Sequence, residues 1–186
     1  MEITFELMRK TKRPVVLVGY MAAGKTTIAK ELAQKWGSQA VDLDEEIERQ
    51  TGKTPARWIT EKGEVAFRKA EAQVLRTLPW DAVEVLSVGG GTPCYAGNME
   101  YLKERAWVVY VQWPLATLVE RLKNDPASRP LIAGVAADDL PAFVGAHLLE
   151  RNGTYGLAHQ ILRPAHQDGV KEVVAQLDQL ARSEGF

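Results

Sequence analysis

The segment at residues 19–26 has the composition of a phosphate-binding loop. It reads GYMAAGKT, which fits the pattern G-x-x-x-x-G-K-[ST] and lies between an apolar run and a helical pattern. Backbone N–H groups of such a loop surround a β-phosphate at the start of a helix. Lys25 is expected to bridge the β- and γ-phosphates, and the Thr26 hydroxyl is expected to bind Mg²⁺. The pattern therefore predicts that ATP binds here with Mg²⁺. GTPases and motor ATPases use related loops, so other residues must indicate the reaction.

Asp42 and Asp44 are the first candidates for contact with a phosphoryl acceptor. They follow a short apolar pair at residues 40–41, at the predicted end of a strand, where α/β sheets bind ligands. In an extended segment residues two apart face the same way, so both carboxylates can line a cleft. One could hold the acceptor hydroxyl, and the other could act through a water bound to Mg²⁺. Alternatively, they cap the glutamate-rich helix that follows.

A helical pattern further along the chain places an arginine between two glutamates. Glu64, Arg68 and Glu71 are spaced i, i+4 and i+7, so they share a helix face. This spacing is consistent with a ladder of surface ion pairs, or with Arg68 acting as a fork for a substrate carboxylate. Residues 89–91 are three glycines that follow a strand pattern. They allow a ligand to approach the backbone closely.

Residues 123–137 lack helical periodicity and are rich in Asn, Pro, Ser and Gly, as a mobile lid would be. Arg129, which precedes Pro130 in this predicted lid, could bring its charge to the transferring phosphoryl group when the lid closes. Arg151, near the end of the next helical pattern, is a second candidate for binding a carboxylate. Taken singly, either arginine could instead be a surface charge.

Strand and helix patterns alternate along the chain, which predicts one α/β domain over residues 1–186 with a parallel sheet and helices on both faces. The predicted strands are 14–19, 40–41, 83–88, 107–111 and 160–162, and the main predicted helices are 26–36, 60–78, 115–122, 138–151 and 170–181. A further helical stretch is predicted to open at residues 54–55.

The composition argues against several classes of partner. The formal net charge is −1, so no broad basic field favours nucleic acid or anionic lipid. Cys94 is the single cysteine, which excludes an internal disulfide and suits a reducing compartment. No apolar run is long enough to span a bilayer. We therefore expect a cytoplasmic protein with neither a nucleic-acid nor a membrane partner.

Taken together, the motifs resemble those of the shikimate kinase family, and the resemblance covers nearly the whole chain. That family combines a Walker A loop, D-x-D, G-E-x-x-F-R-x-x-E, G-G-G, R-P-L in the lid, and an arginine ahead of a tyrosine. In this sequence the six motifs occur in order at residues 19–27, 42–44, 63–71, 89–91 and 129–131, and at Arg151 with Tyr155.

The resemblance implies a three-layer P-loop kinase fold of the nucleoside-monophosphate-kinase type, with a five-stranded parallel sheet in the order 2-3-1-4-5 and a mobile lid. It also implies a monomer that converts shikimate and ATP to 3-phosphoshikimate and ADP, on the chorismate route to aromatic amino acids. Residues 42–78 would form the helical region that binds shikimate, and the implied metal-binding residues are Thr26 and Asp42.

The resemblance also implies roles residue by residue. Asp44 would hold shikimate hydroxyls, and Asp42 would act through the Mg²⁺ shell. Arg121 resembles the family's adenine-stacking arginine, although packing on its own helix stem remains an alternative. The implied catalytic residues are Lys25, Asp42, Asp44 and Arg129. The implied ATP contacts are Ala22, Ala23, Gly24, Lys25, Thr26, Thr27, Arg121 and Arg129. The implied shikimate contacts are Asp44, Arg68, Gly89, Gly90, Gly91 and Arg151, with both arginines on the carboxylate.

Three departures from the family pattern stand out. Ala22 occupies a loop position that is usually glycine, residues 155–158 lack a charged residue often found after the tyrosine, and residues 164–168 match poorly where adenine contacts would fall. Gluconate kinase is the nearest alternative among enzymes. A regulatory protein that binds ATP without catalysis is the alternative outside them, but such a protein should have lost Lys25, Thr26 or the lid arginine.

Overall fold

The computed structural model describes residues 13–124, 130–132 and 134–186. The prediction for Arg129 therefore lies outside the described residues, as do residues 125–128 and 133 of the predicted lid at residues 123–137. In that interval, α7 (Leu115–Asn124) continues through residues 123 and 124, and a short 3-10 turn, η3, covers Pro130–Ile132.

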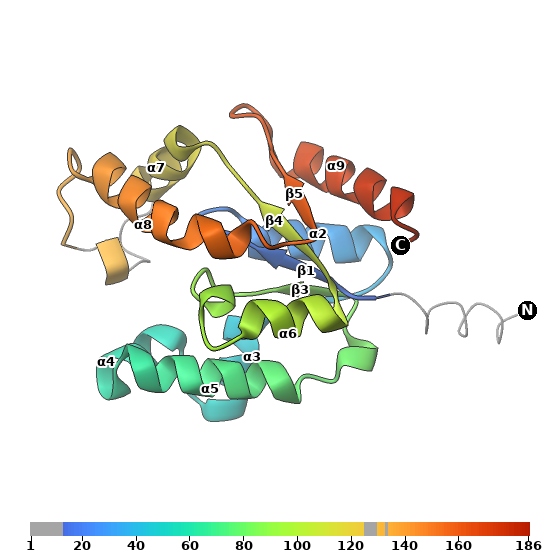
Figure 1. The fold of residues 1–186 in the computed structure, drawn as a ribbon, viewed down its shortest axis with the longest axis horizontal. Coiled ribbons are helices and arrows are strands. Elements are labelled where there is room, and N and C mark those ends of the chain that lie inside the picture. Colours follow the sequence, from blue (N-terminus) through green and yellow to red (C-terminus); the bar gives the residue numbers. More distant parts are fainter. Residues whose placement is uncertain (1–12, 125–129, 133) are drawn as a thin grey trace, which may run out of the picture.

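Five parallel strands form a single sheet in the order β2-β3-β1-β4-β5 (Figure 1). The central strand, β1, pairs with β3 on one side and β4 on the other, with Val15 opposite Val85 and Trp107. The predicted fold class and strand order are confirmed. The strands are β1 (Val15–Val18), β2 (Ala40–Asp42), β3 (Val85–Ser87), β4 (Trp107–Val111) and β5 (Gln160–Leu162).

Helices cover both faces of this sheet and give three layers (Figure 1). Because side chains alternate along a strand, Val15 and Leu17 of β1 enter one apolar core, and Val16 and Val18 enter the other. Helices α2 and α9 contribute to the first core, and α3, α5 and α6 to the second. Besides α7, the helices are α2 (Lys25–Lys35), α3 (Leu43–Thr51), α4 (Pro55–Lys62), α5 (Glu64–Thr77), α6 (Asn98–Arg105), α8 (Leu140–Tyr155) and α9 (Val170–Ser183), with 3-10 turns η1 (Trp80–Ala82) and η2 (Thr92–Cys94).

A helical stretch from residues 54–55 is confirmed as α4, but the predicted start of the longer helix at residue 60 is wrong, because α4 continues to Lys62 and α5 begins only after Gly63. This glycine has φ 82° and ψ 161°, a combination that only glycine adopts readily. Its N–H bonds to the Ile59 carbonyl, which ends α4. Helix α5 therefore begins at Glu64, and Arg68 and Glu71 lie within its first eight residues.

Two further differences from the predicted helices concern α6, which was not predicted, and the end of α8. Helix α6 has no clear periodic signal in the sequence, because it buries few apolar side chains, notably Met99 and Leu102. Helix α8 continues to Tyr155, four residues beyond the predicted end at 151, because Tyr155 is completely buried and anchors its last turn. Among the helices of the described ranges, none has both the length and the apolar character needed to cross a bilayer.

Candidate active site

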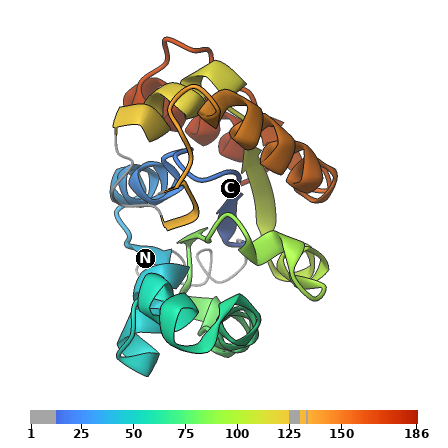
Figure 2. The ribbon, with the colours of Figure 1, turned by 90° about the vertical axis from the view of Figure 1, so that its left-hand side faces the viewer.

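Those predicted functional residues that the structure describes gather at one edge of the sheet. Since all five strands are parallel, their carboxyl ends meet at the same edge. Figure 2 views the molecule from that side, with α4 and α5 at the bottom and α7 and α8 at the top. The loop after β1, the end of β2 at Asp42 and the glycine turn after β3 all open here. The edge therefore brings together residues that are far apart in the sequence.

The phosphate loop runs from Gly19 to Gly24, directly between β1 and α2. A Cβ on Gly19 would lie 2.9 Å from the Val111 carbonyl oxygen, so β4 leaves no room for a side chain. Lys25 is buried, and its Nζ donates to the carbonyl oxygens of Gly19 and Tyr20 at 2.9 and 3.0 Å. The ammonium group therefore lies over its own loop, within reach of the space that phosphates occupy in such loops.

Thr26 and Asp42, the predicted metal-binding pair, are in direct contact. The Thr26 hydroxyl donates to Asp42 Oδ2 at 2.7 Å, and the Ser87 hydroxyl donates to the same oxygen at 2.6 Å. Hydroxyl and carboxylate oxygens are the hard ligands that Mg²⁺ prefers. Within the described ranges, no group of three or more His, Cys, Asp or Glu residues forms a metal cage. Mg²⁺ is usually bound through few protein ligands together with water and substrate phosphates.

Asp42 and Asp44 do not lie in one extended segment, so that part of the prediction is wrong. Helix α3 begins at Leu43, and Asp42 is its N-cap: Asp42 Oδ1 accepts from the N–H groups of Asp44 and Glu45 at 2.9 and 3.4 Å. The capping alternative is therefore correct for Asp42, and it coexists with the contact to Thr26. Asp44 instead stands in the first turn of α3, where its Oδ1 lies 3.3 Å from the Cβ position of Gly89.

Asp44 occupies an environment that disfavours its charge. Burial raises the pKa of Asp44 from 3.8 to about 6, with further increases from Asp42 and Glu71, while Lys25 and Arg68 act in the opposite direction. A carboxyl group with such a pKa is largely ionised at neutral pH and can still take up a proton. It therefore suits contact with a hydroxyl that loses its proton.

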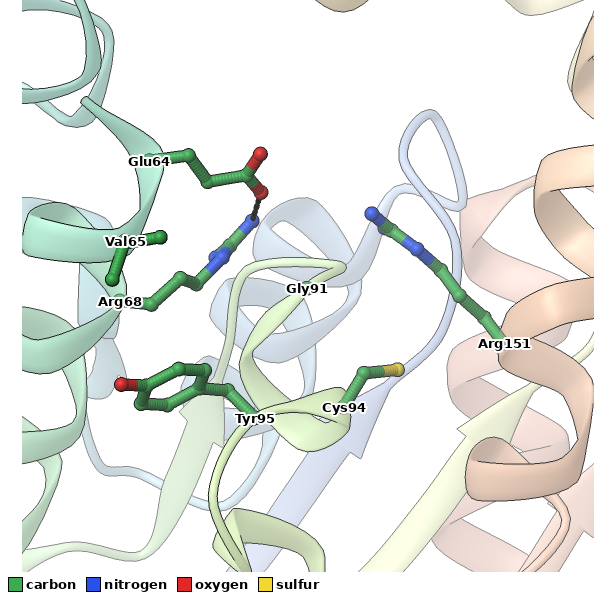
Figure 3. A pocket seen from close by; sticks show the side chains of 7 residues that line it. All are labelled: Glu64, Val65, Arg68, Gly91, Cys94, Tyr95 and Arg151. Carbon is green, nitrogen blue, oxygen red and sulfur yellow. Dashed lines mark hydrogen bonds and ion pairs between the residues drawn. The ribbon is translucent and has the colours of Figure 1, made fainter.

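A cavity of about 290 Å³ lies at the glycine turn, and two arginines face each other across it (Figure 3). Arg68 reaches it from α5 and Arg151 from α8, and their guanidinium groups point toward the space above Gly91. Two such groups from opposite walls can bind one small carboxylate. The cavity is lined by Glu64, Val65, Arg68, Gly91, Cys94, Tyr95 and Arg151.

Arg68 is held in place by both glutamates of its helix face. Its Nη1 donates to Glu71 Oε2 at 2.9 Å, and its Nη2 donates to Glu64 Oε1 at 3.3 Å. Glu71 is completely buried, and its other oxygen accepts from the Thr92 hydroxyl at 2.6 Å. A Cβ on Gly91 would lie only 2.2 Å from Arg68 Nη2, so the guanidinium occupies the place of a side chain at residue 91.

Gly90 lies between Arg151, which lines the cavity, and the phosphate loop. A Cβ at this position would lie 3.4 Å from both Arg151 Nη1 and the backbone nitrogen of Met21. The Tyr155 hydroxyl donates to the Gly90 carbonyl oxygen at 2.6 Å. Burial raises the pKa of Tyr155, so the phenol keeps the proton that this bond requires. The last turn of α8 thus fixes the glycine turn between the two sites.

The structure also places residues that the sequence pattern did not single out. Cys94 is exposed and lines the pocket together with Tyr95. Desolvation nevertheless raises the pKa of Cys94, which does not favour a nucleophilic thiolate. The signal that could have found both residues is their position directly after the glycine turn.

Arg121 packs against protein in this structure. Its guanidinium carbon lies 3.9 Å from the centre of the Trp113 ring, and its Nη1 donates to the Ala22 carbonyl oxygen at 3.2 Å. Ala23 is buried at the end of the loop, and Thr27 follows in the first turn of α2. Arg121 thus adjoins the phosphate loop, while its predicted contact with adenine stays a prediction.

Comparison with known proteins agrees with this geometry. Residues 21–181 match the shikimate kinase family. A shikimate kinase of Flavobacterium psychrophilum is 44% identical over 145 residues, which cover 77% of this chain and 84% of the relative.

Solved structures give the same result at the level of the fold. A shikimate kinase from Acinetobacter baumannii in complex with shikimate has a TM-score of 0.85 at 34% identity, covering 95% of this chain and 97% of the other. A shikimate kinase from Bacteroides thetaiotaomicron has a TM-score of 0.83 at 33% identity, covering 91% and 98%. The phosphate loop, the opposed arginines and these matches lead to one conclusion: the chain belongs to the shikimate kinase family.

Proposed function

We propose that this protein transfers the γ-phosphoryl group of ATP to the 3-hydroxyl of shikimate, giving 3-phosphoshikimate and ADP. The observation that carries this proposal is the pair Arg68 and Arg151, which face each other across a small pocket beside the phosphate loop. An acceptor in that pocket would carry its carboxylate between the two guanidinium groups and direct a hydroxyl toward the loop. Membership of the family, and the related Acinetobacter structure in complex with shikimate, support shikimate as that acceptor.

The residues divide into four tasks in this proposal. Lys25 would neutralise phosphate charge, and Thr26 with Asp42 would hold Mg²⁺ directly or through water. Bound Mg²⁺ supplies charge stabilisation for the phosphoryl group during transfer. Asp44 would orient the acceptor hydroxyl and accept its proton, since its pKa of about 6 leaves it mainly ionised at pH 7. The backbone of residues 89–91 would contact the hydroxyl-bearing ring of the acceptor.

We also propose that the segment at residues 123–137 acts as a lid over the nucleotide. Arg129 would approach the transferring phosphoryl group from the segment at 123–137, and closure would exclude water from the reaction. We also propose that the protein acts as a monomer in the cytoplasm, without nucleic-acid or membrane partners. The net charge of −1 and the single cysteine support this assignment.

Substitution of Arg151 tests the carboxylate clamp. This residue is a better choice than Arg68, because removal of Arg68 would take a partner from the buried Glu71. We expect Arg151→Ala to raise the KM for shikimate by ~10-fold or more, as expected for the loss of a charged hydrogen bond. The KM for Mg·ATP should change by less than about two-fold.

Arg49→Ala provides a matched control. The Arg49 side chain is 72% exposed, and its guanidinium pairs with Glu46 on α3, outside the pocket. This variant should keep both KM values. If Arg151→Ala raised both KM values equally, or neither, the assignment of the clamp would be wrong.

A further inference from the structure

Ala22 has an unfavourable backbone conformation inside the phosphate loop. Its φ is 61°, which places it in the left-handed region, and within the described residues only one other non-glycine residue, Ala96, has a positive φ. A Cβ disfavours this region for L-residues. Such a conformation persists only where surrounding contacts hold it. The loop must therefore receive support from elsewhere in the molecule.

Two side chains from the part of the chain that follows β4 donate hydrogen bonds to successive carbonyl groups of the loop. The Trp113 indole Nε1 donates to the Ala23 carbonyl oxygen at 2.9 Å. Arg121 Nη1 donates to the Ala22 carbonyl oxygen at 3.2 Å. These bonds join residues 90 and 99 positions apart in the sequence. They orient the peptide groups that follow Ala22 and Ala23.

The two supporting side chains also hold each other. The Arg121 guanidinium stacks over the Trp113 ring at 3.9 Å, a geometry that cation–π attraction favours. Trp113 is only 4% exposed and belongs to the apolar core to which α2, α8 and α9 contribute. The indole therefore has a fixed position, from which it contacts Ala23 directly and Ala22 through Arg121.

We propose that Trp113 is a positioning residue for nucleotide binding. Together with Arg121 it keeps the phosphate loop, including the left-handed Ala22, in the shape that directs backbone N–H groups toward a phosphate. Without this support Ala22 returns to a right-handed or extended conformation, and nucleotide binding must restore the left-handed one. The inference rests on the proposed function only in taking residues 19–26 as the nucleotide site, and it is independent of the acceptor.

A double-mutant cycle with Ala22→Gly tests the proposal. Trp113→Phe keeps an aromatic ring beneath Arg121 and removes the indole N–H. Isothermal titration with Mg·ADP, without any acceptor, should show affinity reduced by about five-fold or more, as for the loss of a hydrogen bond. In the Ala22→Gly background the same substitution should cost less than about two-fold, because glycine adopts a positive φ without penalty.

The control is Trp36→Phe. Trp36 likewise donates its indole N–H, to Asp178 Oδ1 at 2.8 Å, but does so at the end of α2 remote from the loop. Its substitution should leave Mg·ADP affinity unchanged. If Trp113→Phe reduced affinity equally with alanine and with glycine at position 22, the proposal would be overturned. It would also be overturned if neither background showed a loss.

Arg121→Met serves as a second variant if Trp113→Phe does not fold. Its loss of affinity should also shrink in the Ala22→Gly background. A loss of equal size in both backgrounds would indicate a direct contact between Arg121 and the nucleotide, and would overturn the supporting role. Failure of the unaltered protein to bind Mg·ADP would refute the nucleotide site itself, whereas binding without turnover of shikimate would refute only the proposed acceptor.

Discussion

A methyl group at residue 91 has no room while Arg68 keeps its position. The Cβ of an alanine there would lie 2.2 Å from Arg68 Nη2, 2.4 Å from Cζ and 2.9 Å from Nη1. Ordinary contacts between heavy atoms need about 3.5 Å, so Gly91→Ala should displace the guanidinium by roughly 1 Å or more. The backbone of Gly91, at φ −85° and ψ −17°, suits alanine. The effect of the substitution should therefore come from Arg68 alone.

The size of the effect follows from the contacts that Arg68 would lose. Displacement breaks or distorts its 2.9 Å bond to Glu71 and moves it away from the acceptor carboxylate. A hydrogen bond to a charged group contributes about 1.5–3 kcal/mol, which corresponds to a decrease of about 10- to 100-fold in kcat/KM for shikimate. The KM for Mg·ATP should stay nearly constant, because the phosphate loop is not altered.

Steady-state kinetics with a coupled assay for ADP release measures both constants. Gly153→Ala is the matched control, since the same methyl group on α8 meets no atom within 4 Å and alanine is a better helix former than glycine. It should leave both constants unchanged. A Gly91→Ala enzyme with a wild-type kcat/KM for shikimate would refute the argument that a side chain at residue 91 displaces the Arg68 guanidinium from its working position.

Further predictions concern Asp44 and Tyr155. Because the pKa of Asp44 is raised to about 6, kcat/KM for shikimate should fall about ten-fold per pH unit below pH 6, and a profile that stays flat down to pH 5 would contradict the role of Asp44. Since this pKa lies above the ordinary value of 3.8, ionisation of Asp44 costs more free energy in the folded protein than in the unfolded chain. This loss of stability is fully present above pH 6 and disappears as the pH falls toward 4. At pH 8, Asp44→Asn should therefore have a higher free energy of unfolding than the unaltered protein, by up to ~3 kcal/mol, and should unfold at a higher temperature. Near pH 4 the two proteins should differ little in stability. Tyr155→Phe removes the 2.6 Å bond to the Gly90 carbonyl and should lower the free energy of unfolding by about 1–2 kcal/mol; an unchanged urea midpoint would argue against that bond.

The parts of the site that depend on local sequence are predictable. The phosphate loop is one contiguous motif, so its position, its Lys25 and the start of α2 within one residue follow from residues 19–26 alone. The strand order, by contrast, rests on contacts between distant segments. It follows from the resemblance to a family, because alternating strands and helices indicate a parallel sheet without indicating its order.

The incorrect predictions fall where tertiary contacts or single backbone angles decide the structure. Spacing alone suggests an extended chain from Asp42 to Asp44, although the Asp42 carboxylate caps α3, which starts one residue later. The helical pattern runs through Gly63, but the φ of 82° at this glycine ends one helix and starts another.

Trp113 and Cys94 belong to no motif in the sequence. Each becomes part of the site through the fold: the indole contacts a loop 90 positions away, and the thiol lines a cavity with residues from α5 and α8.

The acceptor dependence of ADP release tests the proposed reaction itself. Purified protein is incubated with Mg·ATP and either shikimate, gluconate or no acceptor. The proposed function predicts rapid ADP release with shikimate, and only a background rate with gluconate or without acceptor. Turnover on gluconate in place of shikimate would contradict the acceptor while leaving the phosphate chemistry intact. Bound ATP without turnover on either compound would contradict the proposal that the protein is a kinase.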